Sequence, residues 1–463
     1  MPKVVKENIN KNMFYVGTHS GIFHCDEILA VAMIAILAGD VNVIRSRNIE
    51  LLREETDVLV DIGAGHFDHH QKGGNGIREN GAKYASAGLI WKAFCGRIVK
   101  TVIEGSNIER DFTLDEILEI ANGVDKFIIQ EIDKEDNGQT PYIHPFQFVY
   151  SFLPNWNNDK ESFDQKFEEC VEVVIKILKQ AILKVVEMYL YPVEFFSKSF
   201  YGTHDEKDEI FDCSNILALT MQTIIKNEYP EKGKDMYKYT NARSAWKAYG
   251  KDLIKCFYKE PLTEIEVNNI MNYIDQNIIQ SNSSESLFKF ISLYFPNHNE
   301  QMDYDRKLNE CVEVTREVMK NVIVKSVSIC LSPKETELRL ANPRTHIDNI
   351  LVIPAQTFPW ENNAIEHNEK SPNSPIDFVV FPYPDGGYAL QCVPPSKEEM
   401  KKQRISLPEE WAGETSNLPE ISGIPSATFC HNNKFFARAN NYGDIIEMCK
   451  IATNKYGEKK STI

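Results

Sequence analysis

The chain of 463 residues contains no run of about 18 uninterrupted apolar residues, so we expect no membrane-spanning helix. Its ten cysteines are scattered singly and form no C-x-x-C pair, which argues against a zinc ribbon or a thioredoxin-type redox site. Basic residues are scarce, because 51 lysines and arginines stand against 67 acidic residues, a net charge of −16. This negative net charge disfavours broad, nonspecific binding to nucleic acid. A phosphate substrate would then need a local positive centre, which a metal ion would supply.

The first residues, MPKVVKENINKNMF, lack the apolar stretch of a secretory signal and the arginine-rich pattern of a transit peptide. We therefore expect the protein in the cytoplasm or the nucleus. The length of the chain is sufficient for two or three domains.

Two apolar runs that end in glycine, MFYVGTHSG and TDVLVDIGAG, are typical of strands whose C-terminal ends carry loops. Between them, DEILAVAMIAIL is apolar nearly all round and long enough for a buried helix. The order strand, helix, strand predicts an α/β fold with a parallel sheet, which places ligands at the carboxyl ends of the strands. From about residue 84 to 190 the pattern becomes mainly helical.

Three segments of this helical region recur in the same order. KYASAGLIWKA at 83–93 returns as KYTNARSAWKA at 238–248, ILEIANGVDKFIIQ at 117–130 as VNNIMNYIDQNIIQ at 267–280, and FDQKFEECVEV at 163–173 as YDRKLNECVEV at 304–314. They predict a duplicated helical segment, roughly 83–188 copied at 238–327. The stretch EIFDCSNILALTMQTI at 209–224 is related either to GIFHCDEILAVAMIAI at 21–36 or to FDHHQ at 67–71. Because polar residues are lost from the second copy, we expect it to be structural.

The tail from about residue 331 contains a predicted hairpin around Asp385-Gly386-Gly387, a second β-rich stretch and a closing amphipathic helix. It predicts a small α+β domain. We therefore divide the chain into a catalytic domain at 1–195, a degenerate duplicate at 196–330 and a C-terminal substrate-binding domain at 331–463.

Four clusters of imidazoles and carboxylates follow apolar runs, in THSGIFHCDE, VLVDIG, FDHHQ and IDKEDNG. Each alone has a simpler interpretation; Asp136-Asn137-Gly138, for example, is a typical turn. Carboxylates beside neutral imidazoles cannot be buried together without a compensating cation, and two divalent ions would neutralise them. Oxygen and nitrogen ligands without thiolate favour Mn²⁺ or Mg²⁺ over Zn²⁺ or Fe²⁺.

The motifs GTHSGIFHCDEILA, VLVDIGAGHFDHHQ, SAGLIW, DKEDNG, YALQCVPP, LPEEWAG and SGIPSATFCH resemble the melanocyte-proliferating-gene-one family of metal-dependent hydrolases. That family is similar to the DHH phosphoesterases, which are named for their Asp-His-His motif. The resemblance implies a DHH-like parallel sheet with flanking helices, two divalent ions and phosphodiester hydrolysis, with trimming of RNA from its 3′ end.

The resemblance also implies roles for individual residues. One metal would be held by His19, His24 and Asp61, and the other by Asp26, Asp61, His69 and Asp136, with Asp133 as the substitute for Asp136. Asp68 would orient a histidine, and His70 would contact the scissile phosphate. Related exonucleases carry a glycine-rich GGH-like motif where this chain has Ala437-Arg438-Ala439. Either Arg438 replaces that motif as a phosphate ligand or it is a surface residue; His431 is the other candidate for substrate binding.

These observations favour a two-metal 3′→5′ exoribonuclease that acts on RNA or short oligonucleotides. One alternative is a hydrolase of a small phosphoanhydride or a cyclic dinucleotide, which the acidic surface and the missing GGH motif favour. The other is a metal-binding regulator without turnover. The sequence leaves the oligomeric state open, and the resemblance leaves the mitochondrion open as a location.

Overall fold

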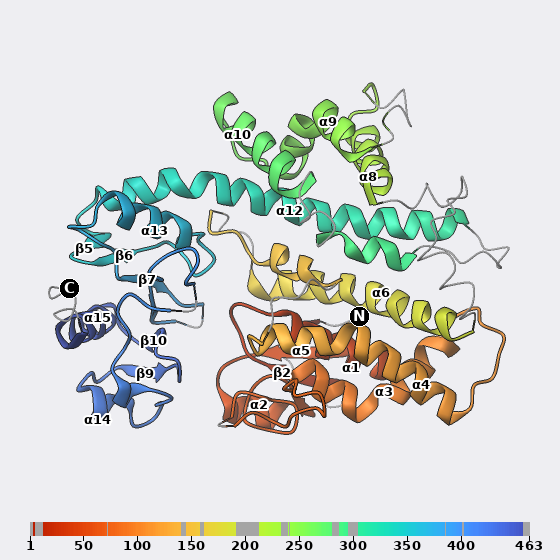
Figure 1. Cartoon of the computed structure of the whole chain (residues 1–463), viewed down its shortest axis with the longest axis horizontal. Helices are drawn as coiled ribbons and strands as arrows, with labels where there is room; N and C mark the ends of the chain where they lie inside the picture. Colours follow the sequence, from red (N-terminus) through yellow and green to blue (C-terminus); the bar gives the residue numbers. More distant parts are fainter. Residues whose placement is uncertain are drawn as a thin grey trace. The chain divides into compact units, whose positions relative to one another are not determined.

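A computed structural model describes residues 3–4, 13–71, 73–139, 145–157, 162–190, 213–232, 239, 241–279, 287–294, 304–384, 386–400 and 402–456. The chain divides into two compact units, one made of residues 1–153 and 161–326 and the other of residues 154–160 and 327–463 (Figure 1). The predicted border between residues 195 and 196 lies outside the described residues, and the border after residue 330 falls within a helix. The division into three domains stays a prediction.

The first unit contains a sheet of four parallel strands in the order β1-β3-β2-β4. The strands are β1 (Lys3–Val4), β2 (Phe14–Thr18), β3 (Val41–Arg45) and β4 (Val58–Leu59). Helix α1 (Cys25–Ala38) connects β2 to β3 and is buried along nearly its whole length, as its uniformly apolar sequence predicts. Helix α2 (Ile49–Glu55) connects β3 to β4. The predicted parallel sheet with helices is confirmed.

A helical layer follows the sheet. It consists of α3 (Ser86–Glu104), α4 (Leu114–Val124), the π-helix η1 (Asp125–Ile129), α5 (Gln130–Asp136), the 3₁₀-helix η2 (Gln147–Phe152) and α6 (Phe163–Leu190). Helix α1 packs against both α3 and α6. Helix α4 begins with a capping box, in which Thr113 accepts from the backbone of Glu116 and the Glu116 carboxylate accepts from the backbone of Thr113.

The second helical segment repeats the first in order and in detail. It consists of α8 (Cys213–Glu228), α9 (Ala242–Phe257), α10 (Glu264–Ile274), the π-helix η4 (Asp275–Ile279), the 3₁₀-helix η5 (Lys289–Tyr294) and α12 (Tyr304–Leu340). Helix α10 has the same capping box, between Thr263 and Glu266. The Trp91 indole donates to Ala121 O at 3.3 Å, and the Trp246 indole donates to Met271 O at 3.2 Å.

The start of this segment corresponds to α1. Helix α8 begins at Cys213 as α1 begins at Cys25, and it packs against α9 as α1 packs against α3. The described part of the stretch, residues 213–224, therefore corresponds to residues 25–36 of GIFHCDEILAVAMIAI and not to FDHHQ.

The two helical segments face each other through equivalent residues. Phe148 of η2 and Phe290 of η5 pack edge to face, with ring centroids 5.5 Å apart. Lys166 of α6 donates to Asn321 of α12 at 3.2 Å, and the equivalent Lys307 of α12 donates to Glu187 of α6 at 3.3 Å. The second segment thus covers an apolar surface of the first.

The second unit is built on a six-stranded mixed sheet in the order β5-β6-β7-β8-β10-β9. Its strands are β5 (His346–Ile347), β6 (Ile350–Val352), β7 (Phe378–Pro382), β8 (Tyr388–Cys392), β9 (Ala427–Cys430) and β10 (Phe436–Ala439). Among these described strands, β6 and β7 are the one parallel pair, and the other neighbours are antiparallel. Around the sheet lie α13 (Glu361–Lys370), η6 (Glu409–Trp411), α14 (Leu418–Ser422) and α15 (Tyr442–Tyr456).

Alternate residues of β7 enter two cores in this unit. Phe378 and Val380 pack in a cluster that includes residues of α15, whereas Val379 and Phe381 pack in a cluster that includes Ala364 of α13. The alternation follows from the strand period of two. The predicted α+β organisation is confirmed, and the predicted hairpin joins β7 to β8, although Asp385 of its turn lies outside the described residues.

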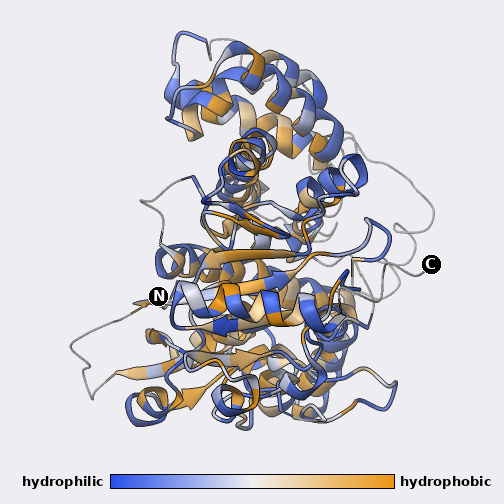
Figure 2. Ribbon diagram, turned by 90° about the vertical axis from the view of Figure 1, so that its left-hand side faces the viewer, coloured by the Kyte–Doolittle hydropathy of each residue, from blue (hydrophilic) through white to orange (hydrophobic). Residues whose placement is uncertain are grey.

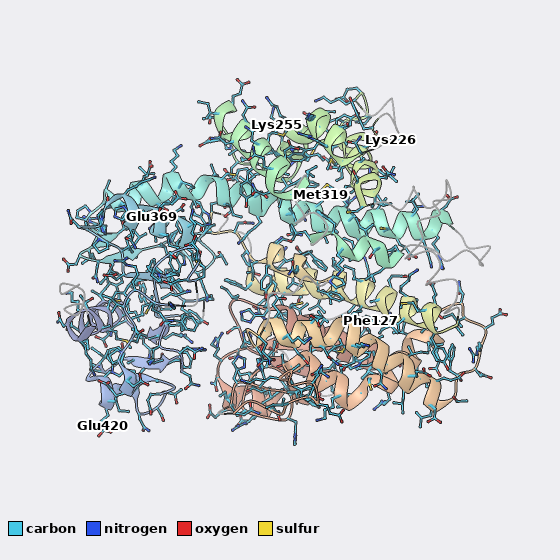
Figure 3. All side chains as sticks on the ribbon, viewed as in Figure 1. Phe127, Lys226, Lys255, Met319, Glu369 and Glu420 are labelled. Atoms are coloured by element: carbon cyan, nitrogen blue, oxygen red, sulfur yellow. The ribbon has the colours of Figure 1, made fainter. Side chains whose placement is uncertain are left out.

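Hydrophobic residues gather on the sheets and on the inner sides of the helices (Figure 2). In the second helical segment, Met319 is buried on α12, whereas Lys226 on α8 and Lys255 on α9 point outwards (Figure 3). On the π-helix η1, Phe127 is an exposed aromatic residue.

Candidate metal centre

Two neighbouring parallel strands bring the first candidate ligands together. His19 follows β2 directly, and Asp61 stands two residues after the end of β4. Because the carboxyl ends of parallel strands share one edge of the sheet, the two side chains meet, with His19 Nε2 3.2 Å from Asp61 Oδ2. Both residues are buried.

The backbone of Asp61 has a φ of 58°, in the left-handed region that residues other than glycine rarely adopt. Asp61 N donates to Phe67 O at 3.0 Å, so the loop after β4 returns to its starting point. This return places the Asp68-His69-His70 motif beside Asp61. Strained backbone of this kind often occurs at functional sites.

The two oxygens of the Asp61 carboxylate face different partners. Oδ2 faces His19, whereas Oδ1 lies 3.2 Å from His69 Nε2 and 3.3 Å from His70 Nδ1. The Ser86 hydroxyl, at the start of α3, donates to Oδ1 at 2.9 Å. Burial alone would raise the pKa of Asp61, but the neighbouring rings of His19 and His69 hold this pKa well below its usual range. Asp61 is therefore an ionised carboxylate between two sets of imidazoles.

Three overlapping groups of side chains could each hold a metal ion, since their ligand atoms lie within 4.8 Å of one another. The first group is His19, His24, Glu27 and Asp61; the second is Asp61, His69 and His70; the third is His24, Asp26 and Asp136. Asp26 Oδ1 and Glu27 Oε1 are buried without a hydrogen-bond partner among the described residues. Unpartnered buried carboxylate oxygens beside imidazoles fit a divalent cation.

His69 lies among three carboxylates. Its Nε2 is 3.0 Å from Asp136 Oδ2, 3.2 Å from Asp61 Oδ1 and 3.7 Å from Asp26 Oδ2. Burial would lower the pKa of His69, but Asp136 and Asp61 raise it to about 11. Burial and the charges of Asp136 and Asp61 raise the pKa of Asp26 well above its usual range. In the metal-free protein, protons thus neutralise a cluster that cations would also neutralise.

The two candidates of the fourth motif lie one helical turn apart on α5 and have different surroundings. Asp136, at the end of the helix, belongs to the third group. Asp133 is fully buried, pairs with Arg78 and accepts from Ala85 N at 3.1 Å and Gly88 N at 3.0 Å. Burial raises the pKa of Asp133 to about 7, although Arg78 opposes the shift. Asp133 therefore anchors the start of α3 and lies outside the three groups.

Asp68 and His70 form a pair at the edge of the cluster. Asp68 is buried, and its Oδ1 lies 2.9 Å from His70 Nδ1 and accepts from His70 N at 3.0 Å. Its Oδ2 accepts from Ala64 N at 2.7 Å. The His70 side chain is 57% exposed, so Asp68 fixes the orientation of a ring that solvent can reach.

The remaining two candidates lie in the second unit. Arg438, on β10, stacks its guanidinium over the Tyr383 ring at 3.8 Å from the centroid. His431 follows β9, and its Nδ1 accepts from Asn433 N at 3.0 Å. The structure gives Arg438 an aromatic partner and gives His431 a role in a turn.

The sequence interpretation missed two residues of the cluster, Glu27 and Ser86. Glu27 stands three residues after His24 at the start of α1, so the two share a face of the helix. That spacing was the available signal. Ser86 lies in the SAGLIW motif, but its contact with Asp61 joins residues 25 positions apart and leaves no local pattern.

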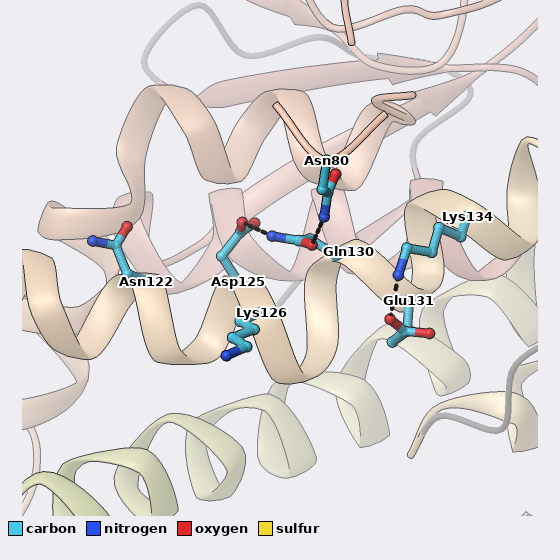
Figure 4. A pocket seen from close by; sticks show the side chains of 7 residues that line it. All are labelled: Asn80, Asn122, Asp125, Lys126, Gln130, Glu131 and Lys134. Atoms are coloured by element: carbon cyan, nitrogen blue, oxygen red, sulfur yellow. Dashed lines mark hydrogen bonds and ion pairs between the residues drawn. The ribbon is translucent and has the colours of Figure 1, made fainter. Parts of the chain in front are cut away.

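A pocket of about 480 Å³ lies elsewhere in this unit and contains none of the candidate ligands. Its lining residues are Asn80, Asn122, Asp125, Lys126, Gln130, Glu131 and Lys134 (Figure 4). Gln130 donates to Asp125 at 2.8 Å and accepts from Asn80 at 2.7 Å, so polar groups of the pocket satisfy one another.

Among the described residues, no helix has the length and apolar character needed to cross a membrane.

Relatives of the chain carry one family name. The chain is 27% identical over 283 residues to the MYG1 protein of Saccharomyces cerevisiae, an alignment that covers 53% of this chain and 81% of the yeast protein. It is 30% identical over 198 residues to the MYG1 protein of Schizosaccharomyces pombe, covering 38% and 59% of the two chains. It is 28% identical over 184 residues to the mouse MYG1 exonuclease, covering 34% and 47%. The chain thus spans about half the length of the mouse relative.

No solved structure matches the chain. The model of a family labelled MYG1 exonuclease and described as uncharacterised protein family UPF0160 matches residues 15–247 and 222–453. The two matches overlap at residues 222–247, from α8 to α9, and together span both units. The chain therefore belongs to the MYG1 exonuclease family, as its motifs predicted.

Proposed function

We propose that the protein is a divalent-metal-dependent phosphodiester hydrolase with a DHH-like centre, and that it shortens RNA from the 3′ end. The observation that carries the proposal is the position of Asp61, whose two oxygens face two different sets of imidazoles. A carboxylate shared in this way is suited to two adjacent metal ions. The name exonuclease, given to the mouse relative, supports a nucleic-acid substrate.

In this proposal His19, His24 and Asp61 hold one ion, and Asp26, Asp61, His69 and Asp136 hold the other. Their oxygen and nitrogen ligands suit Mn²⁺ or Mg²⁺. When bound, two such ions polarise a phosphoryl oxygen and activate water as a nucleophile. Ser86 keeps the Asp61 carboxylate in place through its hydroxyl group.

His70 is the residue of the cluster that meets the substrate. Asp68 holds Nδ1 of the His70 ring and leaves Nε2 for an oxygen of the scissile phosphate. Arg438 and His431 of the second unit are the other proposed substrate-binding residues, with Arg438 in the place of the GGH-like motif. The acidic charge of the chain restricts the substrate to one that these local groups and the ions can hold.

A second candidate function keeps the same centre and changes the substrate to a small phosphoanhydride or a cyclic dinucleotide. The net charge of −16 and the Ala437-Arg438-Ala439 sequence favour this candidate, because both weaken the binding of a long polyanion such as RNA.

Purified protein with Mn²⁺ should be given labelled RNA, DNA, pyrophosphate and cyclic dinucleotides. RNA products that shorten from the 3′ end support the proposal, whereas turnover of the small substrates alone supports the second candidate. No turnover with any substrate, despite bound Mn²⁺, would indicate a metal-binding regulator.

Removal of an outer-shell partner of a metal ligand lowers activity by about 10–100-fold. The variants Asp61→Ala and His69→Ala should lose more activity than this. His66→Ala is the matched control, because His66 is an exposed histidine of the same loop and lies outside the three groups. Equal activity in Asp61→Ala and the unaltered protein would refute the metal centre.

A further inference from the structure

Glu27 is a buried carboxylate at the centre of the cluster, and the ligand set proposed above does not use it. Its relative exposure is 0%. Its Oε2 lies 2.6 Å from His19 Nε2 and 3.6 Å from His24 Nδ1. Its Oε1 is buried without a hydrogen-bond partner among the described residues. A buried charge in this state is costly unless a cation faces it.

Helix capping accounts for only part of these contacts. Glu27 occupies the third position of α1 and accepts from His24 N at 3.2 Å, which completes a capping box. Two other capping boxes in the chain use Glu116 and Glu266, and both glutamates are partly exposed. A capping glutamate thus has no need of burial, so the complete burial of Glu27 requires another explanation.

The second helical segment separates the two roles. Glu116 and Glu266 occupy equivalent positions in α4 and α10, so both copies retain this capping residue. By contrast, Asp26 and Glu27 of α1 correspond to Ser214 and Asn215 of α8, counted from the cysteine that begins each helix. The glutamate disappears together with the neighbouring aspartate of the metal groups. This pattern fits a ligand better than a cap.

We propose that Glu27 is a direct ligand of the first metal ion, which it binds together with His19, His24 and Asp61. The inference rests on the proposed metal centre. Two imidazoles and two carboxylates then surround one divalent cation, and the charge of Glu27 belongs to this ion alone, because Asp61 is shared with the second group. Without Glu27, the first ion would have only the shared carboxylate of Asp61 to balance its charge.

The test compares the unaltered protein, freed of metal, with the variants Glu27→Gln and Glu116→Gln. Glutamine keeps the size of glutamate and an oxygen that accepts from the helix backbone, so capping survives in both variants. Calorimetric titration with Mn²⁺ measures the number and affinity of bound ions. The absorption spectrum of bound Co²⁺ reports the ligands directly, and thermal unfolding without metal reports folding.

Glu27→Gln should weaken one of the two Mn²⁺ sites by more than about 100-fold, beyond the usual effect of an outer-shell change, and should alter the Co²⁺ spectrum. Without metal, the unfolding temperature of Glu27→Gln should fall, because the His19 ring loses a charged partner 2.6 Å away, but the unfolding transition should remain cooperative. Glu116→Gln should leave both metal sites unchanged. Wild-type Mn²⁺ affinity together with an unchanged Co²⁺ spectrum in Glu27→Gln would overturn the inference.

The outcomes also separate this inference from the proposed function. If the unaltered protein binds two ions and hydrolyses no phosphodiester, the proposed function fails while the role of Glu27 stands. If the unaltered protein binds no Mn²⁺ or Co²⁺, the metal centre and the role of Glu27 both fail.

Discussion

The carboxylate of Asp133 occupies the space beside Gly88 where every other residue carries a Cβ atom. A Cβ at Gly88 would lie 2.0 Å from Asp133 Oδ2, while Gly88 N donates to Asp133 Oδ1 at 3.0 Å. The contact joins α5, which ends in Asp136, to the start of α3, which carries Ser86. Glycine at position 88 thus allows α5 and the start of α3, which both carry residues of the candidate metal centre, to lie in contact.

Gly88→Ala should therefore destabilise the protein by about 1–3 kcal/mol, because the added methyl group must displace a buried carboxylate. Gly96→Ala, in the same helix, is the matched control, since a Cβ at that position meets no atom closer than 3.6 Å. It should stabilise the protein by about 0.5–1 kcal/mol through helix propensity. Urea unfolding of both variants measures the difference, and equal free energies of unfolding would contradict the prediction.

The stability of the metal-free protein should fall as the pH rises from about 6.5 to 9. Burial would lower the pKa of His19, but the charges of Glu27 and Asp61 raise it to about 9, above the value of 6.5 in the unfolded chain. The protonated ring therefore contributes stability that is fully present below pH 6.5 and is lost as the pH passes 9. The contribution is at most about 3 kcal/mol.

Urea unfolding in the presence of a chelator, at pH values from 6 to 9, measures this slope. His19→Gln should reduce it, since glutamine does not titrate. Saturating Mn²⁺ should abolish it, because a metal ion on His19 replaces the proton. A metal-free protein whose stability rises over this range would contradict the assignment of His19.

Asp68→Asn should lower turnover by about 10–100-fold while leaving the affinity for Mn²⁺ unchanged, because Asp68 contacts His70 and the loop and lies outside the three metal groups. Steady-state kinetics and calorimetric titration distinguish the two effects. A loss of Mn²⁺ binding would contradict the prediction and would show that Asp68 supports the metal ligands as well as His70.

Phe290→Ala should destabilise the protein by about 3–5 kcal/mol, since Phe290 is fully buried and packs on Phe148. The affinity for Mn²⁺ should stay the same, because the second helical segment supplies none of the candidate ligands. Phe127→Ala is the control, as Phe127 is 57% exposed. A loss of Mn²⁺ affinity in folded Phe290→Ala would give the second segment a direct part in the metal centre.

Local sequence patterns were sufficient to predict many of the helices and strands and to select most of the residues considered as candidate ligands. The apolar runs predicted the strands that precede His19 and Asp61, since a buried parallel strand reads as a short hydrophobic run and its end as a loop. Parallel connection then predicted that these strand ends meet. The repeat of Trp91 as Trp246, and of the capping box, follows directly from the duplicated sequence.

Other features depend on contacts between distant parts of the chain. Asp133 and Asp136 both follow the same apolar run, but only the packing of α5 decides that Asp136 lies near His69 and Asp133 near Arg78. The burial of Glu27 likewise depends on the approach of His19 from another element.

The sequence by itself determined the family, the α/β class, the helical repeat and the four motifs, because hydrophobic period and residue type act over a few neighbouring positions. The tertiary structure alone decided which carboxylates share a space with the histidines, because charge and burial are set by side chains that approach from elements far apart in the chain.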